Sequence, residues 1–212
     1  IKLRSAVDLL QDSTRDLRQV LDAVTELSQN WTGALVILES RLETGKDVET
    51  KLDMISRFCL DRMNEARVFM AQNGEGFRIS LWWFDDKEAS LQLLLSNEIV
   101  DQGTLDTKFA VGEGLLGQAF AEDRVWNLNN APAEPYYKKT RDNPSYRGLL
   151  LVPIREGREP VGQIPVGMLA IDREKPEYFD TAIENVACSL SHVVGFALLY
   201  ADDEANLRGS TQ

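Results

Sequence analysis

A seven-residue pattern of apolar side chains over residues 1–43 constrains the fold more than any other feature of the sequence. Apolar residues recur there at alternating spacings of four and three, which is typical of a helix that supercoils with a partner. At 1.5 Å per residue this helix would be about 60 Å long and would project beyond a domain formed by the remaining residues. We therefore predict a coiled-coil or bundle helix over residues 1–46; the alternative is a helix that packs only on its own domain. The pattern comprises Leu3, Val7, Leu10, Thr14, Leu17, Leu21, Val24, Ser28, Trp31, Leu35, Leu38 and Leu42.

The remaining residues predict an α+β domain over 47–207, followed by a tail at 208–212. Helical periodicity predicts a second helix over 48–71 and a last helix over 181–207. Between them, period-two patterns and short apolar runs predict strands. The expected strands cover 77–84, 90–96, 107–110, 125–128, 148–154 and 166–172.

Composition excludes several classes of protein. With 43% hydrophobic residues among 212, the chain can bury a core, and its net charge of -11 argues against binding to nucleic acid. Cys59, Cys188 and the single His192 are scattered, so no metal site is expected, and free cysteines suit a reducing cytoplasm. No apolar run of about 18 residues is evident, so membrane insertion is not expected. Because the chain begins at Ile1, we expect it to be part of a larger protein.

Three glycines, Gly112, Gly114 and Gly117, have the G-x-G-x-x-G spacing of a dinucleotide-binding loop. Such a loop opens a long helix in a parallel sheet and has an acidic residue about 20 positions further on. Here the following helix is expected to end near Asp123, the strands form hairpins, and the acidic residue is missing. We therefore interpret the glycines as a tight turn and a close approach of helix to sheet.

Three motifs in order resemble the GAF domain family over residues 48–200: V-G-E-G-L-L-G at 111–117, G-L-L-L-V-P-I at 148–154 and V-G-M-L-A-I-D at 166–172. The resemblance implies an antiparallel sheet of five or six strands flanked by helices. One face would hold a pocket for an unknown small molecule, and the other would pack on helices that form a dimer interface. It also implies a regulatory, non-enzymatic domain that is attached to an output domain or partner protein. The preceding helix resembles the signalling helices that join such domains in parallel homodimers.

By this resemblance the pocket lies between the sheet and the loop 126–147. Aromatic and charged side chains near that loop could hold a planar or anionic ligand. The alternative is that they form a minor core, in which case the domain is an interaction module without a ligand. The candidate ligand-binding residues are Trp83, Phe109, Trp126, Tyr136, Tyr137, Tyr146, Arg147 and Asp172. The expected dimer interface comprises Leu3, Val7, Leu10, Leu17, Leu21, Val24, Trp31, Leu35 and His192.

More specific ligands and activities have less support. The family's cyclic-nucleotide pattern is matched by Arg173, Phe179 and Glu184, but not by Asp172 and Ile183. A covalent bilin chromophore and the thiol-based sulfoxide reductases of this fold both need cysteines near the loop, and none is there. No catalytic triad is indicated around the single histidine. We therefore expect no covalent chromophore, no metal and no enzymatic activity.

Overall fold

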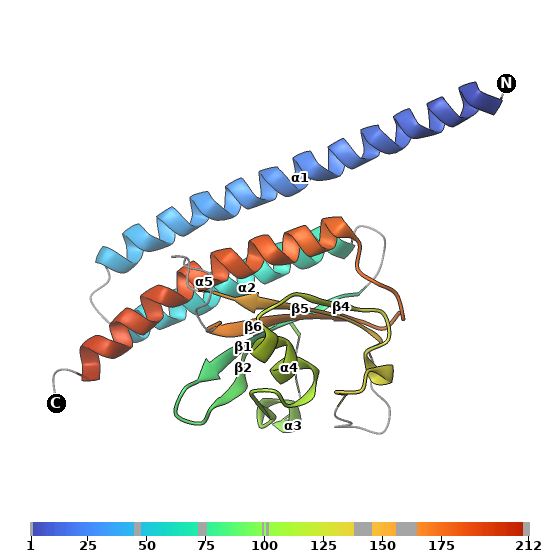
Figure 1. Ribbon diagram of the computed structural model, residues 1–212. Coiled ribbons are helices and arrows are strands. Elements are labelled where there is room, and N and C mark those ends of the chain that lie inside the picture. Colours follow the sequence, from blue (N-terminus) through green and yellow to red (C-terminus); the bar gives the residue numbers. More distant parts are fainter. Residues whose placement is uncertain are drawn as a thin grey trace.

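The computed structural model describes residues 2–44, 48–71, 76–98, 100, 102–137, 146–155 and 165–209. Its centre is one antiparallel sheet of six strands. Helices α2 (Val48–Met70) and α5 (Thr181–Gly209) cover one face of this sheet, α1 (Lys2–Thr44) packs on these two helices, and shorter elements cover the other face (Figure 1). The α+β class and the antiparallel sheet of five or six strands are confirmed.

The strands follow the order β3-β2-β1-β6-β5-β4, and every neighbouring pair is antiparallel. Every residue of the neighbouring strands β5 and β6 is buried, which explains why both read as largely apolar runs. The strands are β1 (Arg78–Asp85), β2 (Ser90–Ser96), β3 (Lys108–Ala110), β4 (Trp126–Leu128), β5 (Gly148–Ile154) and β6 (Gly167–Arg173).

The larger hydrophobic core lies between the sheet and the three long helices. Ile79 and Leu81 of β1 enter it from the sheet, and Trp31, Leu38 and Leu42 enter it from α1. The C-terminal half of the apolar stripe on α1 therefore packs within its own chain, as the alternative interpretation expected. The N-terminal half of α1 projects past the domain (Figure 1).

Helix α5 packs against both the sheet and the other helices. A Cβ atom on Gly195 would lie 2.1 Å from the carbonyl oxygen of Arg155, so glycine allows α5 to approach the end of β5 closely. Among the described residues, Thr181–Leu198 is the one helical segment long and apolar enough to cross a membrane, which the sequence analysis overlooked. Because 56% of that segment is buried inside the fold, it also has the character of a core helix.

The opposite face of the sheet carries the short helices α3 (Gln102–Leu105), α4 (Gly114–Glu122) and the 3-10 turn η2 (Ala131–Ala133). Gly112 and Gly114 have φ angles of 80° and 66°, which favour glycine. A Cβ atom on Gly117 would lie 2.1 Å from the carbonyl oxygen of Ala110. The glycines therefore form a tight turn that holds α4 close to β3, as interpreted from the sequence.

Candidate functional site

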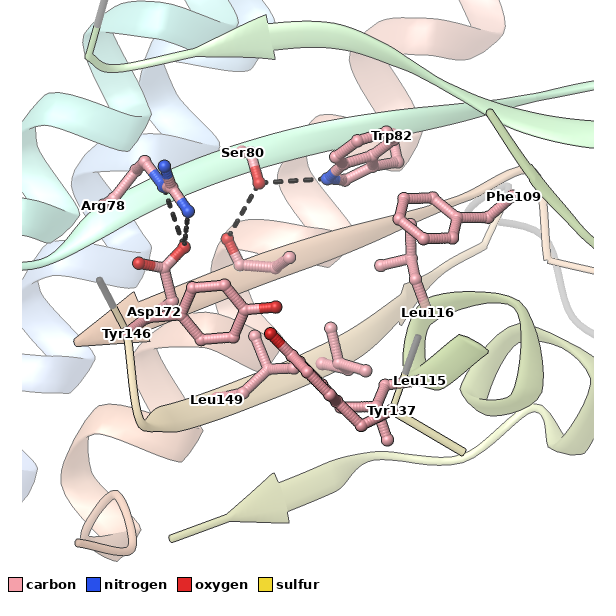
Figure 2. Close-up of a pocket in the computed structure, with 12 residues that line it drawn as sticks. Arg78, Ser80, Trp82, Phe109, Leu115, Leu116, Tyr137, Tyr146, Leu149 and Asp172 are labelled. Carbon is pink, nitrogen blue, oxygen red and sulfur yellow. Dashed lines mark hydrogen bonds and ion pairs between the residues drawn. The ribbon is translucent and has the colours of Figure 1, made fainter. Parts of the chain in front are cut away.

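A pocket of about 100 Å³ lies on the sheet face that α1, α2 and α5 leave uncovered. Strands β1, β5 and β6 form its floor, while α4, β3 and two tyrosines form its walls (Figure 2). We call it the sheet pocket. Its lining residues are Arg78, Ser80, Trp82, Phe109, Leu115, Leu116, Tyr137, Tyr146, Leu149, Leu151, Ala170 and Asp172.

The floor follows from strand alternation and register. Arg78, Ser80 and Trp82 are two residues apart on β1, so their side chains point to the same face. In the antiparallel pairing with β6, Arg78 lies opposite Asp172 and Ser80 lies opposite Ala170. The register therefore places a guanidinium group and a carboxylate side by side at one end of the pocket.

The ion pair between Arg78 and Asp172 is asymmetric. Arg78 donates from Nε at 2.9 Å and from Nη2 at 2.8 Å, and both bonds go to Oδ2 of Asp172. The Asp172 side chain is 12% exposed, and this burial raises its pKa to about 6 although Arg78 acts to lower it. The nearby Glu98 carboxylate raises the pKa of Asp172 further. Asp172 is therefore ionised at neutral pH but titrates just below it.

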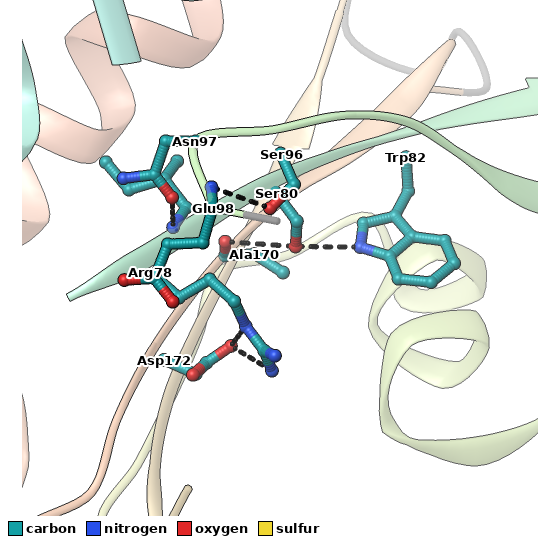
Figure 3. A network of polar contacts seen from close by, with 9 residues as sticks. Arg78, Ser80, Trp82, Ser96, Asn97, Glu98, Ala170 and Asp172 are labelled. Carbon is teal, nitrogen blue, oxygen red and sulfur yellow. Dashed lines mark hydrogen bonds and ion pairs between the residues drawn. The ribbon is translucent and has the colours of Figure 1, made fainter. Parts of the chain in front are cut away.

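The other end of the pocket is apolar and rigidly held. The indole Nε1 of Trp82 donates to Oγ of Ser80 at 3.0 Å, and that hydroxyl is 3.5 Å from the carbonyl oxygen of Ala170 (Figure 3). Phe109 packs edge-on against the Trp82 ring, with centroids 5.3 Å apart and an interplanar angle of 72°. Because the indole N–H has a partner, the Trp82 ring is fixed without needing a ligand.

Tyr137 and Tyr146 close the pocket above the ion pair. Their hydroxyl groups lie next to each other in Figure 2, and the Arg78 guanidinium lies 6.0 Å from the centroid of the Tyr146 ring. Burial raises the pKa of Tyr146 well above its usual range, and Tyr137 and Asp172 raise it further. Tyr146 therefore remains a neutral phenol that can donate a hydrogen bond.

Four of the predicted ligand-binding residues meet in the pocket: Phe109, Tyr137, Tyr146 and Asp172. Trp83 does not. It lies on the opposite face of β1 and packs against the helix-side core, because the alternation that directs Trp82 into the pocket turns its neighbour away.

The other three predicted residues lie beside the pocket. Trp126 and Tyr136 pack against each other with centroids 6.1 Å apart, and the Arg124 guanidinium lies 5.5 Å from the Trp126 ring. Arg147 is exposed. Its position is fixed by its backbone, which accepts a hydrogen bond from the N–H of Ala131 and donates one to the carbonyl of Arg173. Of the loop 126–147, residues 138–145 lie outside the described residues.

The sequence analysis missed Arg78, Ser80 and Trp82 as site residues. The signal that could have found them is the β1 alternation itself, because it separates a polar and aromatic face from the aliphatic one. The aliphatic lining residues Leu115, Leu116, Leu149 and Leu151 carry no such signal, since core and pocket residues of this type read alike.

The expected dimer-interface residues fall into four groups. Trp31 is fully buried in its own chain, and its Nε1 donates to Oε2 of Glu65 on α2 at 2.7 Å. It is therefore part of the intramolecular core, and its assignment to a dimer interface is wrong for this structure. Val24 and Leu35 are partly buried against the same core, whereas Leu21 and His192 are exposed. The side chains of Leu3, Val7, Leu10 and Leu17 lie outside the described residues.

The residues that matched the cyclic-nucleotide pattern hold the fold together instead. Arg173 donates from Nη2 to the Tyr178 carbonyl at 2.6 Å, and its guanidinium lies 4.6 Å from the Phe179 ring centroid. Asn127 of β4 donates to Oε2 of Glu184 at 3.2 Å and to the Phe179 carbonyl at 2.8 Å. These contacts join β4 and β6 to the start of α5 and leave these side chains outside the pocket lining.

Both cysteines lie on the helix side of the sheet. Cys59 on α2 is fully buried, and burial raises the pKa of its thiol to about 12. Burial also raises the pKa of Cys188 on α5. The sheet pocket thus has no thiol in its lining, and the described part of the chain has no group of three potential metal ligands.

A sheet with helices on one face and a small pocket on the other is the architecture of a sensor-type α+β domain. A family model of the GAF domain matches residues 52–199. The chain therefore belongs to the GAF domain family, whose members are regulatory sensor domains in signalling proteins.

Solved structures share this fold at low sequence identity. The GAF domain of a phosphoenolpyruvate-protein phosphotransferase from Coxiella burnetii is 19% identical, with a TM-score of 0.57 over 84% of this chain and 98% of that one. A type II free methionine-R-sulfoxide reductase from Thermoplasma acidophilum is 19% identical, with a TM-score of 0.51 over 68% and 94%. Residues 122 to 287 of a methyl-accepting chemotaxis protein are 16% identical, with a TM-score of 0.53 over 78% and 96%. Curated proteins give no significant sequence match to this chain.

Proposed function

We propose that this chain is a regulatory domain that binds a small molecule in the sheet pocket and passes the bound state to its long helices. The observation that carries the proposal is the pocket itself, which has an ion pair at one end and a rigid aromatic end opposite. A concave apolar site with a few convergent polar groups is the usual form of a small-molecule site. Its free cysteines, Cys59 and Cys188, suit the cytoplasm as its compartment.

Strands β1 and β6 provide the physical connection between pocket and helices. On β1, Ser80 and Trp82 face the pocket, while Ile79 and Leu81 pack in the core under the helices. A ligand that moves β1 by a fraction of an ångström therefore changes the surface on which the helices pack. Packed helices respond by selecting between discrete arrangements, which an attached output domain or partner protein can detect.

We further propose that the domain is a parallel homodimer. Support comes from the apolar stripe on α1, which continues into the part of the helix that projects past the domain (Figure 1). Leu21, at the start of this projecting part, is 53% exposed. A second copy is a partner that would present the same apolar stripe along the same length.

Catalysis is not part of this proposal. The thiol groups lie across the sheet from the pocket, and the single histidine lies on an exposed position of α5. Within the pocket lining, the carboxylate of Asp172 is held in the ion pair with Arg78. The similarity to sulfoxide reductases is therefore taken as one of fold.

A second candidate function is an interaction module that binds no ligand. The observation that favours it is the small size of the pocket, about 100 Å³, together with Val36 and Ile37 of α1, which are 59% and 58% exposed. In this case the pocket side chains would serve as a minor core, and the helices would carry the function.

Native mass spectrometry and a thermal-shift screen separate the two candidates. The screen should include nucleotides, amino acids and oxidised anions. If the domain senses a ligand, we expect either a co-purified ligand mass or a rise of several degrees in the unfolding temperature. Ala170→Leu, which fills the pocket floor, should abolish either signal. Ala121→Leu, at an exposed position of α4, is the matched control and should retain it. Absence of any ligand signal in the wild type would favour the interaction module.

A further inference from the structure

The sheet pocket combines one buried carboxylate with four aromatic rings, and we propose that it binds a small organic cation, a primary ammonium group on a short apolar body. This inference rests on the proposed sensing function, because it names the ligand class for the same pocket.

The carboxylate of Asp172 retains an acceptor for a ligand. Both N–H groups that Arg78 gives to the pair bind Oδ2, and across the described residues no hydrogen bond reaches Oδ1. Oδ1 can therefore accept a hydrogen bond from a bound molecule, and an ammonium group is a strong donor to a carboxylate. An anionic ligand, in contrast, has no hydrogen-bond donor to offer to this oxygen.

The charges around the pocket favour a cation over an anion. Arg78 and Asp172 compensate each other, and Glu98 adds a further negative charge that acts on Asp172. At Tyr146, whose hydroxyl lies within the pocket, Asp172 has a larger effect on the phenol pKa than Arg78 has. The Arg78 side chain is 30% exposed against 12% for Asp172, so solvent screens the positive charge more.

Aromatic rings provide the second half of a cation site. Trp82, Phe109, Tyr137 and Tyr146 all line the pocket; the two tyrosines lie nearer Asp172, and Trp82 and Phe109 lie at the opposite end (Figure 2). Ring faces attract an ammonium group, most strongly where water is excluded. Leu115, Leu116 and Leu149 then cover the apolar body of the ligand.

The available space limits the ligand to a few heavy atoms. Pockets for drug-sized ligands measure about 300–1,000 Å³. The sheet pocket, at about 100 Å³, is much smaller and would have to open widely to accept a nucleotide. A four- or five-carbon amine is a ligand of the right size.

The inference is tested with four probes that each contain a straight four-carbon chain: butylamine, L-norvaline, pentanoate and butan-1-ol. Butylamine and L-norvaline carry the ammonium group, and pentanoate and butan-1-ol lack it. Binding is followed by NMR through the four tryptophan indole N–H signals, and loss of one signal in Trp82→Phe assigns Trp82. We expect Trp82 to shift with both ammonium compounds, which should bind on the order of tenfold tighter than pentanoate and butan-1-ol.

Asp172→Asn keeps the shape of the site and removes the charge. It should weaken butylamine binding on the order of tenfold, whereas Asp86→Asn, the same change in an exposed turn, should have no effect. If L-norvaline binds more tightly than butylamine, the native ligand is an amino acid; if the two bind equally well, it is a simple amine. Both results support the cation.

Two outcomes overturn the inference in distinguishable ways. Pentanoate or butan-1-ol binding as tightly as butylamine would show a pocket that senses an anion or an apolar molecule, and the sensing function would stand. No Trp82 shift with any of the four probes, and no ligand signal in the broader thermal-shift screen, would remove the cation and the sensing function together. The wild-type comparison decides the question even if Asp172→Asn does not fold.

Discussion

Asp172 is a residue whose burial opposes folding at neutral pH. Its pKa is about 6 in the folded chain and 3.8 in its unperturbed state, because the cost of burying the carboxylate exceeds the benefit of the Arg78 pair. At pH values between 3.8 and about 6, the Asp172 carboxyl is therefore protonated to a greater extent in the folded chain than in the unfolded chain. The charged groups that act on the pKa of Asp172 are Arg78 on β1, which lowers it, and Glu98 after β2, which raises it.

This pKa makes a prediction about stability and pH. A raised carboxyl pKa stabilises the fold below the unfolded value, and that contribution is lost as pH rises through about 6. The free energy of unfolding of the wild type, relative to Asp172→Asn, should therefore rise as pH falls from 7.5 to 4, by up to about 3 kcal/mol. Urea unfolding of both proteins at several pH values measures this difference. A constant difference, or one that grows in the opposite direction, would show that Asp172 is not shifted upward.

Two glycines in contrasting surroundings give a second prediction. A Cβ on Gly117 would lie 2.1 Å from the Ala110 carbonyl oxygen, whereas a Cβ on Gly33 of α1 would have nothing within 4 Å. Gly33→Ala should therefore stabilise the chain by about 0.5–1 kcal/mol, since alanine favours a helix interior. Gly117→Ala should destabilise it by several times that amount, because α4 must move off the sheet. Thermal unfolding of the pair tests this; equal effects would contradict the close approach of α4.

The side chains of β1 show how far the sequence could locate the site. Alternation correctly separates Phe77, Ile79, Leu81 and Trp83 from Arg78, Ser80 and Trp82. It could not say which set faces a pocket, because both faces of this sheet are covered and both sets contain a tryptophan. The sequence also could not identify Arg78 as the partner of Asp172, because this ion pair depends on the register of two strands whose paired residues are 94 positions apart.

At the scale of elements, the hydrogen bond of Trp31 is a polar contact that helps to join α1 to the domain. Trp31 of α1 is fully buried and donates to Glu65 of α2, and Glu65 also pairs with Arg62 at 2.7 Å. Glu65 therefore keeps a partner when the tryptophan is changed. This allows the packing of the ring to be separated from its hydrogen bond.

Three variants measure how firmly α1 is held. Trp31→Ala should cost about 3–5 kcal/mol through the cavity it creates, and Trp31→Phe should cost about 1–2 kcal/mol. Leu21→Ala, at a position 53% exposed, should change stability by less than about 0.5 kcal/mol and is the control. Denaturant unfolding gives the energies, and hydrogen exchange reports release of α1. A neutral Trp31→Ala would mean that α1 is not packed on the domain.

Most elements were predictable because each carries a local signal, whereas their packing partners were not. Helical periodicity and period-two patterns predicted all three long helices and all six strands within a few residues. The heptad stripe of α1 was read as an interface with another chain, yet Trp31, Leu38 and Leu42 pack on α2 and α5. An apolar stripe specifies that a helix is covered but not whether the covering helix belongs to the same chain.

For the whole molecule, the sheet forms the boundary between the side that holds the pocket and the side that holds the long helices. The pocket and the helix layer share β1 and β6, while the chain ends lie at opposite ends of the molecule (Figure 1). Helices α1 and α5 contact each other, so a change in sheet shape reaches the elements that lead to both termini. An arrangement of this kind can link one pocket to domains attached at either end.

The proposed dimer makes the last prediction. The projecting half of α1 leaves Leu21 exposed on the heptad stripe, while Gln19 is exposed outside the stripe. If two copies pair along this stripe, Leu21→Glu places like charges in the interface and should weaken dimerisation on the order of tenfold or more. Gln19→Glu adds the same charge off the stripe and should leave the dimer intact. Sedimentation velocity at one to one hundred micromolar measures both. A wild-type chain that stays monomeric throughout this range, or equal effects of the two variants, would show that the stripe on α1 does not form a homodimer.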